Sequence, residues 1–373
     1  MGTHRESYET TRPPVSLWHP GAYPAAGGSA DEHIIAPSGG QCTTRQWLSF
    51  RRIRATIRGR KAGAGVNGKN YIVCIGAANL DIHGFSDRSL LARESNPGEV
   101  HRSAGGVARN IAENLSRLGH EVSLVTALGD DPGGRYLNES CEALGIDTSR
   151  SITVPGVETS TYISINDTDG DMALALSDMR ILDSVNTAHL DDIADWIDGS
   201  SAIVIDAGLT PGCIRFIAER FRKKRVFVNP VSIGKCERMR KVTGKFHGLC
   251  LNQAEASELS GVSIYGPDDI PRAATALHQA GVERVFVTAG ASGAWYRDGS
   301  YEGHIPAAAI RVRNANGAGD AFTAGSVHAE LAGGSVREAA RTGVAAASIA
   351  LQSNDTVSES MSTSALEWQL QRM

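Results

Sequence analysis

The sequence predicts an α/β fold: a doubly wound, mainly parallel sheet with helices on both faces and a small β lid. From Tyr71 onward, short apolar runs alternate with helix-like segments, an order typical of parallel sheets covered by helices. Two β-rich runs at 158–180 interrupt this order, and such an insertion commonly covers the carboxyl edge of the sheet, where ligands bind. The composition, 41% hydrophobic and 21% charged over 373 residues, is that of an ordinary globular protein.

The elements follow from local patterns. Uninterrupted apolar runs predict buried strands, and Gly119 ends the first helix. The predicted order is strand 71–76, helix 106–119, strand 121–129, helix 132–144, β-rich runs 160–167 and 171–178, strand 201–207, helix 211–222, strands 225–230 and 246–252, helices 253–260 and 268–280, strand 284–290, a short hairpin, and helices 318–332 and 335–351.

Residues 1–69 differ from the rest of the chain. They contain ten Lys and Arg against four Asp and Glu, are rich in Gly, Pro and Ser, and lack a sustained apolar period. We therefore predict a disordered basic extension with a short helix near Trp47–Ile57, followed by a single domain at 70–373. These residues contain no apolar segment followed by a cleavage site, so a secretory signal is not expected. The run from Arg45 to Lys61 vaguely resembles an organellar transit peptide, and a mis-assigned start explains it equally well.

One motif in this extension is misleading. The segment 63–70 nearly fits a phosphate-binding P-loop, but Asn70 stands where Ser or Thr binds magnesium. The segment also precedes a strand, whereas a P-loop follows one.

Composition excludes several function classes. Residues 70–373 contain 27 Lys and Arg against 37 Asp and Glu, an acidic balance unlike that of nucleic-acid-binding proteins. No segment is apolar for long enough to span a membrane. The six cysteines show neither CxxC nor zinc-ligand spacing, which favours reduced, buried thiols in a cytoplasmic protein. We expect a small-molecule partner, with no nucleic acid and no membrane.

The most informative stretch is 314–320, Asn-Ala-Asn-Gly-Ala-Gly-Asp. Gly317, Ala318 and Gly319 open a predicted helix, whose free N–H groups and dipole favour anions. A carboxylate beside such a site repels phosphate, so Asp320 is better suited to accept a proton from a hydroxyl that attacks a phosphoryl group. The alternative is a turn with an N-terminal carboxylate that the helix dipole stabilises.

Two polar motifs follow early elements. Asn79 and Asp81 come directly after the first strand and, in extended backbone, lie on one side, as binding paired sugar hydroxyls requires. Gly105 and Gly106 open the helix at 106–119 and let a ligand lie against backbone, with Asn110 one turn further on. The alternatives are turn chemistry for the first motif and a plain N-terminal turn for the second.

Two more motifs follow later strands. Asn252 and Glu255 begin a helix, where the carboxylate suits magnesium bound through water; the alternative is a capping box. Small residues at Thr288, Gly290 and Gly293 admit a nucleotide close to the backbone, and the alternative is a tight turn.

In this order, the motifs resemble the PfkB, or ribokinase-like, family of sugar and nucleoside kinases over residues 70–352; GGVARN and GAGD match two family signatures. The resemblance implies a ribokinase-like fold, with ATP and Mg²⁺ as cofactors. It implies that Asp320 is the base and that the anion hole is formed by Gly317, Ala318 and Gly319. The residues that hold the ribose would be Asn79, Asp81, Gly105, Gly106 and Asn110. Magnesium and phosphate would be organised by Glu255 with Asn252, and the nucleotide site would be lined by Thr288, Gly290 and Gly293. It also implies a lid from about 82–104 and 158–180.

Within the family, residues 95–98, 159–162 and 229–235 resemble those of pseudouridine kinases. This implies transfer to a ribose 5′-hydroxyl, with Ser160, Tyr162 and Asp178 as candidates for reading the base. Ribokinase-, fructokinase- or adenosine/inosine kinase-like activity, and an inactive sugar or nucleoside sensor, are the alternatives. The family usually has Asp-Thr where this chain has Asn314-Ala315, which leaves K⁺ activation open. Lid strands of the family often form homodimers, so a homodimer is expected.

Overall fold

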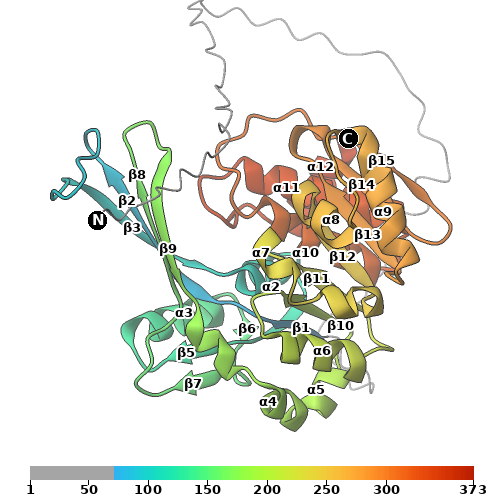
Figure 1. The fold of residues 1–373 in the computed structure, drawn as a ribbon, viewed down its shortest axis with the longest axis horizontal. Coiled ribbons are helices and arrows are strands. Elements are labelled where there is room, and N and C mark those ends of the chain that lie inside the picture. The colour runs from blue at the N-terminus through green and yellow to red at the C-terminus, as the bar shows by residue number, and fades with distance from the viewer. Residues whose placement is uncertain (1–70) are drawn as a thin grey trace, which may run out of the picture. The chain divides into compact units, whose positions relative to one another are not determined.

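The computed structural model describes residues 71–373, so the predictions made for residues 1–69, including the short helix and the P-loop-like segment, lie outside it. Three sheets are present (Figure 1). The main sheet contains β1 (Tyr71–Ile75), β4 (Glu121–Val125), β6 (Ile146–Asp147), β10 (Ala202–Asp206), β11 (Val226–Asn229), β12 (Gly248–Asn252), β13 (Arg284–Thr288), β14 (Ala294–Arg297) and β15 (Glu302–Ile305).

The main sheet is doubly wound. Its strand order is β15-β14-β13-β12-β11-β10-β1-β4-β6, and all neighbours are parallel except the β13-β14-β15 hairpins. Strand β1 pairs with β10 on one side and β4 on the other, so the chain winds outward in both directions from this point. Ligands of such sheets bind outside the carboxyl ends of the strands beside the switch.

Helices cover both faces of this sheet. They are α2 (Val107–Arg117), α3 (Pro132–Ala143), α4 (Thr187–Asp192), α5 (Ala194–Asp198), α6 (Pro211–Arg220), α7 (Ile233–Cys236), α8 (Gln253–Ser260), α9 (Ile270–Gln279), α10 (Ala318–Leu331), α11 (Val336–Leu351) and α12 (Thr363–Gln371), with 3₁₀ turns η1 (Arg180–Ser184), η2 (Arg240–Lys245), η3 (Pro267–Asp269) and η4 (Gly290–Ser292). The predicted α/β class is confirmed.

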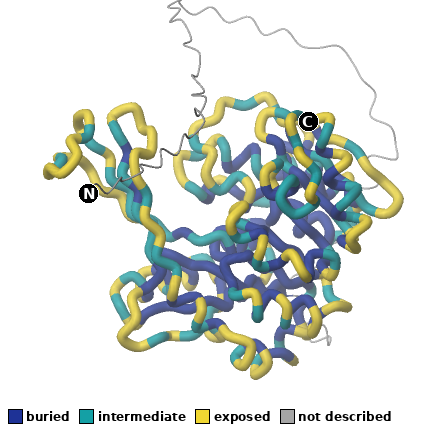
Figure 2. The backbone as a smooth tube through the Cα atoms, in the orientation of Figure 1, coloured by how far each residue is buried: buried dark blue, intermediate teal, exposed yellow. Residues whose placement is uncertain are grey.

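Alternate residues of β1 enter different cores. Val73 packs in the core that includes Ile217 of α6, whereas Ile72 packs in the core that includes Ile111 of α2. A strand buried on both faces needs an unbroken apolar sequence, which is what YIVCI supplies. Figure 2 shows this central strand within the buried interior.

A four-stranded sheet, here called the small sheet, has the order β3-β2-β8-β9. Its strands are β2 (Asn79–Ser86), β3 (Gly98–Gly105), β8 (Thr161–Asn166) and β9 (Met172–Asp178). The segments at 82–104 and 158–180 that the sequence assigns to a lid supply these strands. Because side chains alternate, Asp81 and its register partner Tyr162 share one face, and Ile82 and Ile163 share the other.

The predicted strand at 121–129 is wrong as a single element. The chain leaves the main sheet at Thr126, and β5 (Ala127–Gly129) pairs instead with β7 (Ile152–Val154). The amide of Gly76 donates to the carbonyl of Val125, the last residue of β4 that pairs with β1. The local apolar pattern continues through the break, so only pairing partners reveal it.

Helix α12 was not predicted, although its sequence carries a signal. The side chain of Ser362 accepts a hydrogen bond from the amide of Ala365, and Leu366 and Leu370 pack in one core cluster. A capping residue followed by an i, i+4 apolar pair is a helix signature. Within residues 71–373, no helix is both long enough and apolar enough to cross a membrane.

Candidate active site

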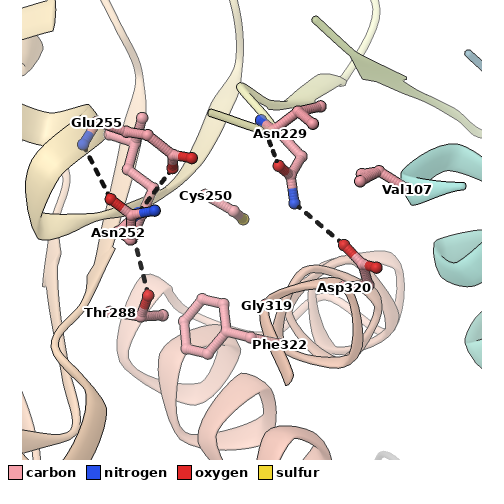
Figure 3. Close-up of a pocket in the computed structure, with 11 residues that line it drawn as sticks. Val107, Asn229, Cys250, Asn252, Glu255, Thr288, Gly319, Asp320 and Phe322 are labelled. Atoms are coloured by element: carbon pink, nitrogen blue, oxygen red, sulfur yellow. Dashed lines mark hydrogen bonds between the residues drawn. The ribbon is translucent and has the colours of Figure 1, made fainter. Parts of the chain in front are cut away.

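Asp320 lies in the first turn of α10 and faces a cavity of about 150 Å³ (Figure 3). The cavity lies at the carboxyl ends of β11, β12 and β13, on the carboxyl edge of the main sheet. It is lined by Val107, Asn229, Val231, Cys250, Leu251, Asn252, Glu255, Thr288, Gly319, Asp320 and Phe322. The predicted residues Asn252, Glu255, Thr288, Gly319 and Asp320 therefore meet here.

Helix α10 begins without a capping side chain. Gly317 is its N-cap residue, with φ of 74°, and no side chain accepts a hydrogen bond from the first turn. A Cβ at Gly317 would collide with the carbonyl oxygen of Thr356, whereas a Cβ at Gly319 would meet nothing within 4 Å. The N–H groups that open α10 through Gly317, Ala318 and Gly319 thus remain available to an anion, as the sequence predicts for this helix start.

The carboxylate of Asp320 is 8% exposed. Burial raises its pKa from the ordinary value to about 7; the nearby Asp206 and Glu255 carboxylates also raise it, and a hydrogen bond from Asn110 opposes the rise. The Nδ2 atom of Asn110 lies 3.0 Å from Oδ2 of Asp320. A carboxyl group with a pKa near neutrality can exchange a proton with a hydroxyl at physiological pH.

A second amide lies against the other carboxylate oxygen. Asn229 ends β11, and its Nδ2 atom lies 3.5 Å from Oδ1 of Asp320 (Figure 3). Its Oδ1 atom accepts a hydrogen bond of 2.9 Å from the amide of Val231. Val231 has φ of 70°, a conformation that strains a β-branched residue. Asn229 was not predicted as a site residue, although it ends a strand as Asn252 does.

Asp206 was also missed. It ends β10, is fully buried, and accepts hydrogen bonds from the amides of Ala77 (2.8 Å), Gly208 (2.7 Å) and Ala108 (3.0 Å). These bonds hold the turn after β1 against the start of α2 at the switch point of the sheet. Burial raises the pKa of Asp206, and the backbone amides and Lys235 oppose that rise. The sequence signal for Asp206 is a charged residue at the end of an apolar strand.

The predicted sugar-binding residues form a second group beside the first. Asn79 donates a hydrogen bond to Asp81, so both side chains lie on one side of β2 as predicted. A Cβ at Gly105 would collide with the Asp81 carboxylate, and one at Gly106, where φ is 100°, would collide with the Ala77 carbonyl. Burial raises the pKa of Asp81 to about 6, against the opposing effects of Asn79 and Arg109.

Asn252 and Glu255 form the capping box that the sequence left as the alternative. The backbone N–H of each residue donates to the side chain of the other, at 2.9 Å in both directions. Burial raises the pKa of Glu255. The cap engages Oε2 of Glu255, so Oε1 remains for a ligand. Within the described part of the chain, no three His, Cys, Asp or Glu residues form a metal cage. Mg²⁺ commonly binds through one carboxylate, waters and substrate phosphates, so Glu255 fits it.

Of the remaining predicted residues, Thr288 lines the cavity and the others lie outside its lining. Gly290 and Gly293 follow β13 and do not line it, whereas Thr288 lines it and donates to the Leu251 carbonyl at 3.1 Å. Ser160 is buried, and its carbonyl accepts a hydrogen bond from the amide of Leu80. Tyr162 lies on the small sheet and donates to Sδ of Met172 at 3.3 Å.

Comparison with known proteins identifies the family. The model of the pfkB family of carbohydrate kinases matches residues 69–363. The pseudouridine kinase of Escherichia coli K12 is 35% identical over 284 residues, covering 76% of this chain and 91% of that protein. An uncharacterised sugar kinase of the same organism is 32% identical over 310 residues, covering 81% of this chain and 86% of that protein.

A solved structure agrees with these sequence matches. The carbohydrate kinase of Agrobacterium tumefaciens is 30% identical, with a TM-score of 0.73, and the match covers 82% of this chain and 98% of that one. The fold, the motifs and the family match coincide over the same residues. The chain belongs to the pfkB family of carbohydrate kinases, which are phosphotransferases with a hydroxyl group as acceptor.

Proposed function

We propose that this protein transfers the γ-phosphoryl group of ATP to the ribose 5′-hydroxyl of a nucleoside, and that the nucleoside is pseudouridine. The observation that carries the proposal is the placement of Asp320: a buried carboxylate with a pKa near 7, in the first turn of a helix with no capping side chain. The similarity to a pseudouridine kinase over most of both chains supports the choice of substrate.

Asp320 is the proton acceptor in this mechanism. The bond between the 5′-oxygen and the γ-phosphorus forms while the bond from that phosphorus to the β,γ-bridging oxygen breaks, and the hydroxyl proton passes to Asp320. In a loose transition state the proton moves late, so positioning and electrostatics supply most of the catalysis. The amides of Asn110 and Asn229 hold the two carboxylate oxygens in place. The N–H groups at Gly317, Ala318 and Gly319 stabilise charge on the transferred group.

Other residues bind the two substrates. Glu255 and Asn252 would hold Mg²⁺ through water, and Mg²⁺ when bound neutralises phosphate charge. Thr288, Gly290 and Gly293 would lie along the nucleotide. Asn79, Asp81, Gly105, Gly106 and Asn110 would bind the ribose, and the small sheet would be the lid, with Ser160 and Tyr162 toward the base. The described cysteines are all buried and unpaired, which supports a reducing, cytoplasmic compartment.

A substrate panel tests the proposal. ADP release with ATP and Mg²⁺ is measured on pseudouridine, uridine, adenosine, ribose and fructose, in sodium and in potassium buffers. We expect the highest kcat/KM on pseudouridine. Higher kcat/KM on ribose or fructose would show that the substrate is a sugar and not a nucleoside, an outcome that the similarity to the 32% identical sugar kinase makes worth testing. Binding without ADP release would indicate a sensor.

The potassium arm of the panel addresses residue 314. The Asn314 side chain donates to the Asn354 carbonyl at 2.9 Å and accepts from the Asn316 amide at 2.9 Å. Because a neutral amide with both ends engaged replaces the carboxylate expected from the family, we propose that turnover is independent of K⁺.

Activity should decline in acid. Because the pKa of Asp320 is raised to about 7, the base form predominates above that pH and is progressively lost as pH falls through it. Asp81, with a pKa of about 6, then protonates and weakens ribose binding. We expect log kcat/KM for the nucleoside to fall with unit slope below pH 7 and more steeply below pH 6. A profile flat down to pH 5 would contradict both assignments.

We also propose that the small sheet forms a homodimer. Val100, Leu174 and Leu176 are 64–68% exposed and lie on the face opposite Asp81, where an apolar patch favours association. Leu174→Lys should convert a dimer to a monomer in sedimentation experiments. The control is Leu91→Lys, because Leu91 is exposed in the turn between β2 and β3, outside this face. A wild-type monomer would refute the proposal.

A further inference from the structure

The amide of Asn110 has a defined orientation. Its Nδ2 atom donates to Oδ2 of Asp320 at 3.0 Å, and its Oδ1 atom accepts from Nη1 of Arg109 at 3.3 Å. With the amide reversed, its oxygen would face a carboxylate and its NH₂ group would face a guanidinium, so both contacts would become repulsive. The guanidinium of Arg109 therefore determines which end of the amide meets Asp320.

Arg109 is itself held firmly. Nη1 also donates to the carbonyl of Ala104 in β3 at 3.0 Å, and Nη2 lies 2.6 Å from Oε2 of Glu113. Arg109 and Glu113 are each 5% exposed. Planar guanidinium groups can make several directed bonds at once, whereas an ammonium group is a point charge. One side chain thus links the small sheet, helix α2 and the amide that contacts Asp320.

Glu113 has a second cation, which provides a comparison within the same helix. Nη2 of Arg117 lies 2.8 Å from Oε1 of Glu113, and Nε donates to that atom at 2.9 Å. The hydrogen bonds of Arg117 go to Glu113 and to the carbonyl of Glu359, at 3.3 Å, and not to Asn110. The two arginines therefore share the helix and the ion pair with Glu113, whereas Arg109 alone donates to the Asn110 amide and to β3.

We propose that Arg109 is a positioning residue for phosphoryl transfer, which acts by holding the Asn110 amide with its NH₂ group toward Asp320. The inference rests on the proposed role of Asp320 as proton acceptor. The contrasting interpretation is that Arg109 only stabilises α2 through its i, i+4 pair with Glu113. The two interpretations differ in what they predict for turnover and its pH dependence.

Arg109→Met, compared with Arg117→Met, tests the inference. We expect Arg109→Met to lower kcat about 10- to 100-fold, because a freed amide misplaces the base, with the KM for ATP unchanged. The acid limb of the kcat profile should move to higher pH, because the Asn110 hydrogen bond lowers the pKa of Asp320. Arg117→Met should lose stability and keep wild-type kcat. The inference would be overturned if both variants kept wild-type kcat, or if both lost the same fraction of it.

A double-mutant cycle gives a second readout. If Arg109 acts through Asn110, the variant Arg109→Met with Asn110→Ala should have the same kcat as Asn110→Ala alone. Independent, multiplicative losses would show that Arg109 acts by another route. Should Arg109→Met fail to fold, Arg109→Lys retains the charge beside Glu113 and lacks the planar fork. Reduced kcat at an unchanged melting temperature supports the inference, and wild-type kcat overturns it.

The outcome for Asp320→Asn separates this inference from the proposed function. Wild-type turnover in Asp320→Asn would remove Asp320 as proton acceptor, and with it the premise of this inference, while the choice of substrate would still be decided by the substrate panel. An inactive Asp320→Asn variant alongside wild-type kcat in Arg109→Met would leave the proposed function and remove only the role of Arg109.

Discussion

Replacement of Asp320 by asparagine is expected to lower kcat about 10²- to 10⁴-fold, the usual range for removing a general base. Affinity for ATP should change little, because the N–H groups of α10 that bind phosphate belong to the backbone. The measurements are ADP release at saturating substrates and direct ATP titration. Turnover within a few-fold of wild type would show that another group accepts the proton.

Thermal unfolding is the control for that variant. Burial raises the pKa of Asp320 in the folded protein to about 7, above its ordinary value near 3.8. The folded state therefore holds the proton more tightly, and stability falls as pH rises from about 4 to 7 and the buried carboxyl ionises. Asp320→Asn removes this cost and keeps a similar shape, so its melting temperature at pH 8 should exceed that of the wild type. A lower value would point to misfolding as the cause of lost turnover.

Gly317→Ala is expected to lower kcat about 10²- to 10³-fold, the loss typical for removing one anion-hole donor. Gly317 has φ of 74°, and an added Cβ would collide with the backbone carbonyl of Thr356, which cannot move as a flexible side chain can. The first turn of α10 must shift to relieve the collision, and its N–H groups shift with it. Steady-state ADP release measures the loss.

Gly333→Ala is the matched control. Gly333 follows the other end of α10 with φ of 85°, and a Cβ there would meet nothing within 4 Å. Both substitutions force an L-residue into the left-handed region, at about 1–2 kcal/mol. Only Gly317→Ala adds a collision at the anion site, so Gly333→Ala should lose stability and keep wild-type kcat. Equal kcat in the two variants would remove Gly317 from the anion hole.

The motif residues could be found from the sequence because the position of each is determined by the few residues around it. The start of α10 is specified by Gly317 and Gly319, and the position of Asp320 in the first turn follows from that start. Similarly, Asn252 and Glu255 are three residues apart at a helix start, and both the capping box and a metal role can be derived locally. Interactions within one turn require no knowledge of distant pairing.

Contacts around Asp320 could not be found in this way. Asn110 and Asn229 reach it from 210 and 91 positions away, and each amide is oriented by a different neighbour, the Arg109 guanidinium and the strained Val231 amide. No periodicity specifies such a meeting, because it depends on where α2 and β11 lie against α10.

The sequence alone determined the α/β class, the alternation of strands and helices and the candidate base, because apolar periodicity and glycine-rich helix starts are local physical constraints. The tertiary structure alone decided that the chain changes sheets at Thr126, that Asp206 joins β1 to α2, and that Asp320 is buried with a pKa near 7. Burial and electrostatics sum over groups that only folding brings together, so a pKa is a property of the fold and not of the segment that carries the carboxyl group.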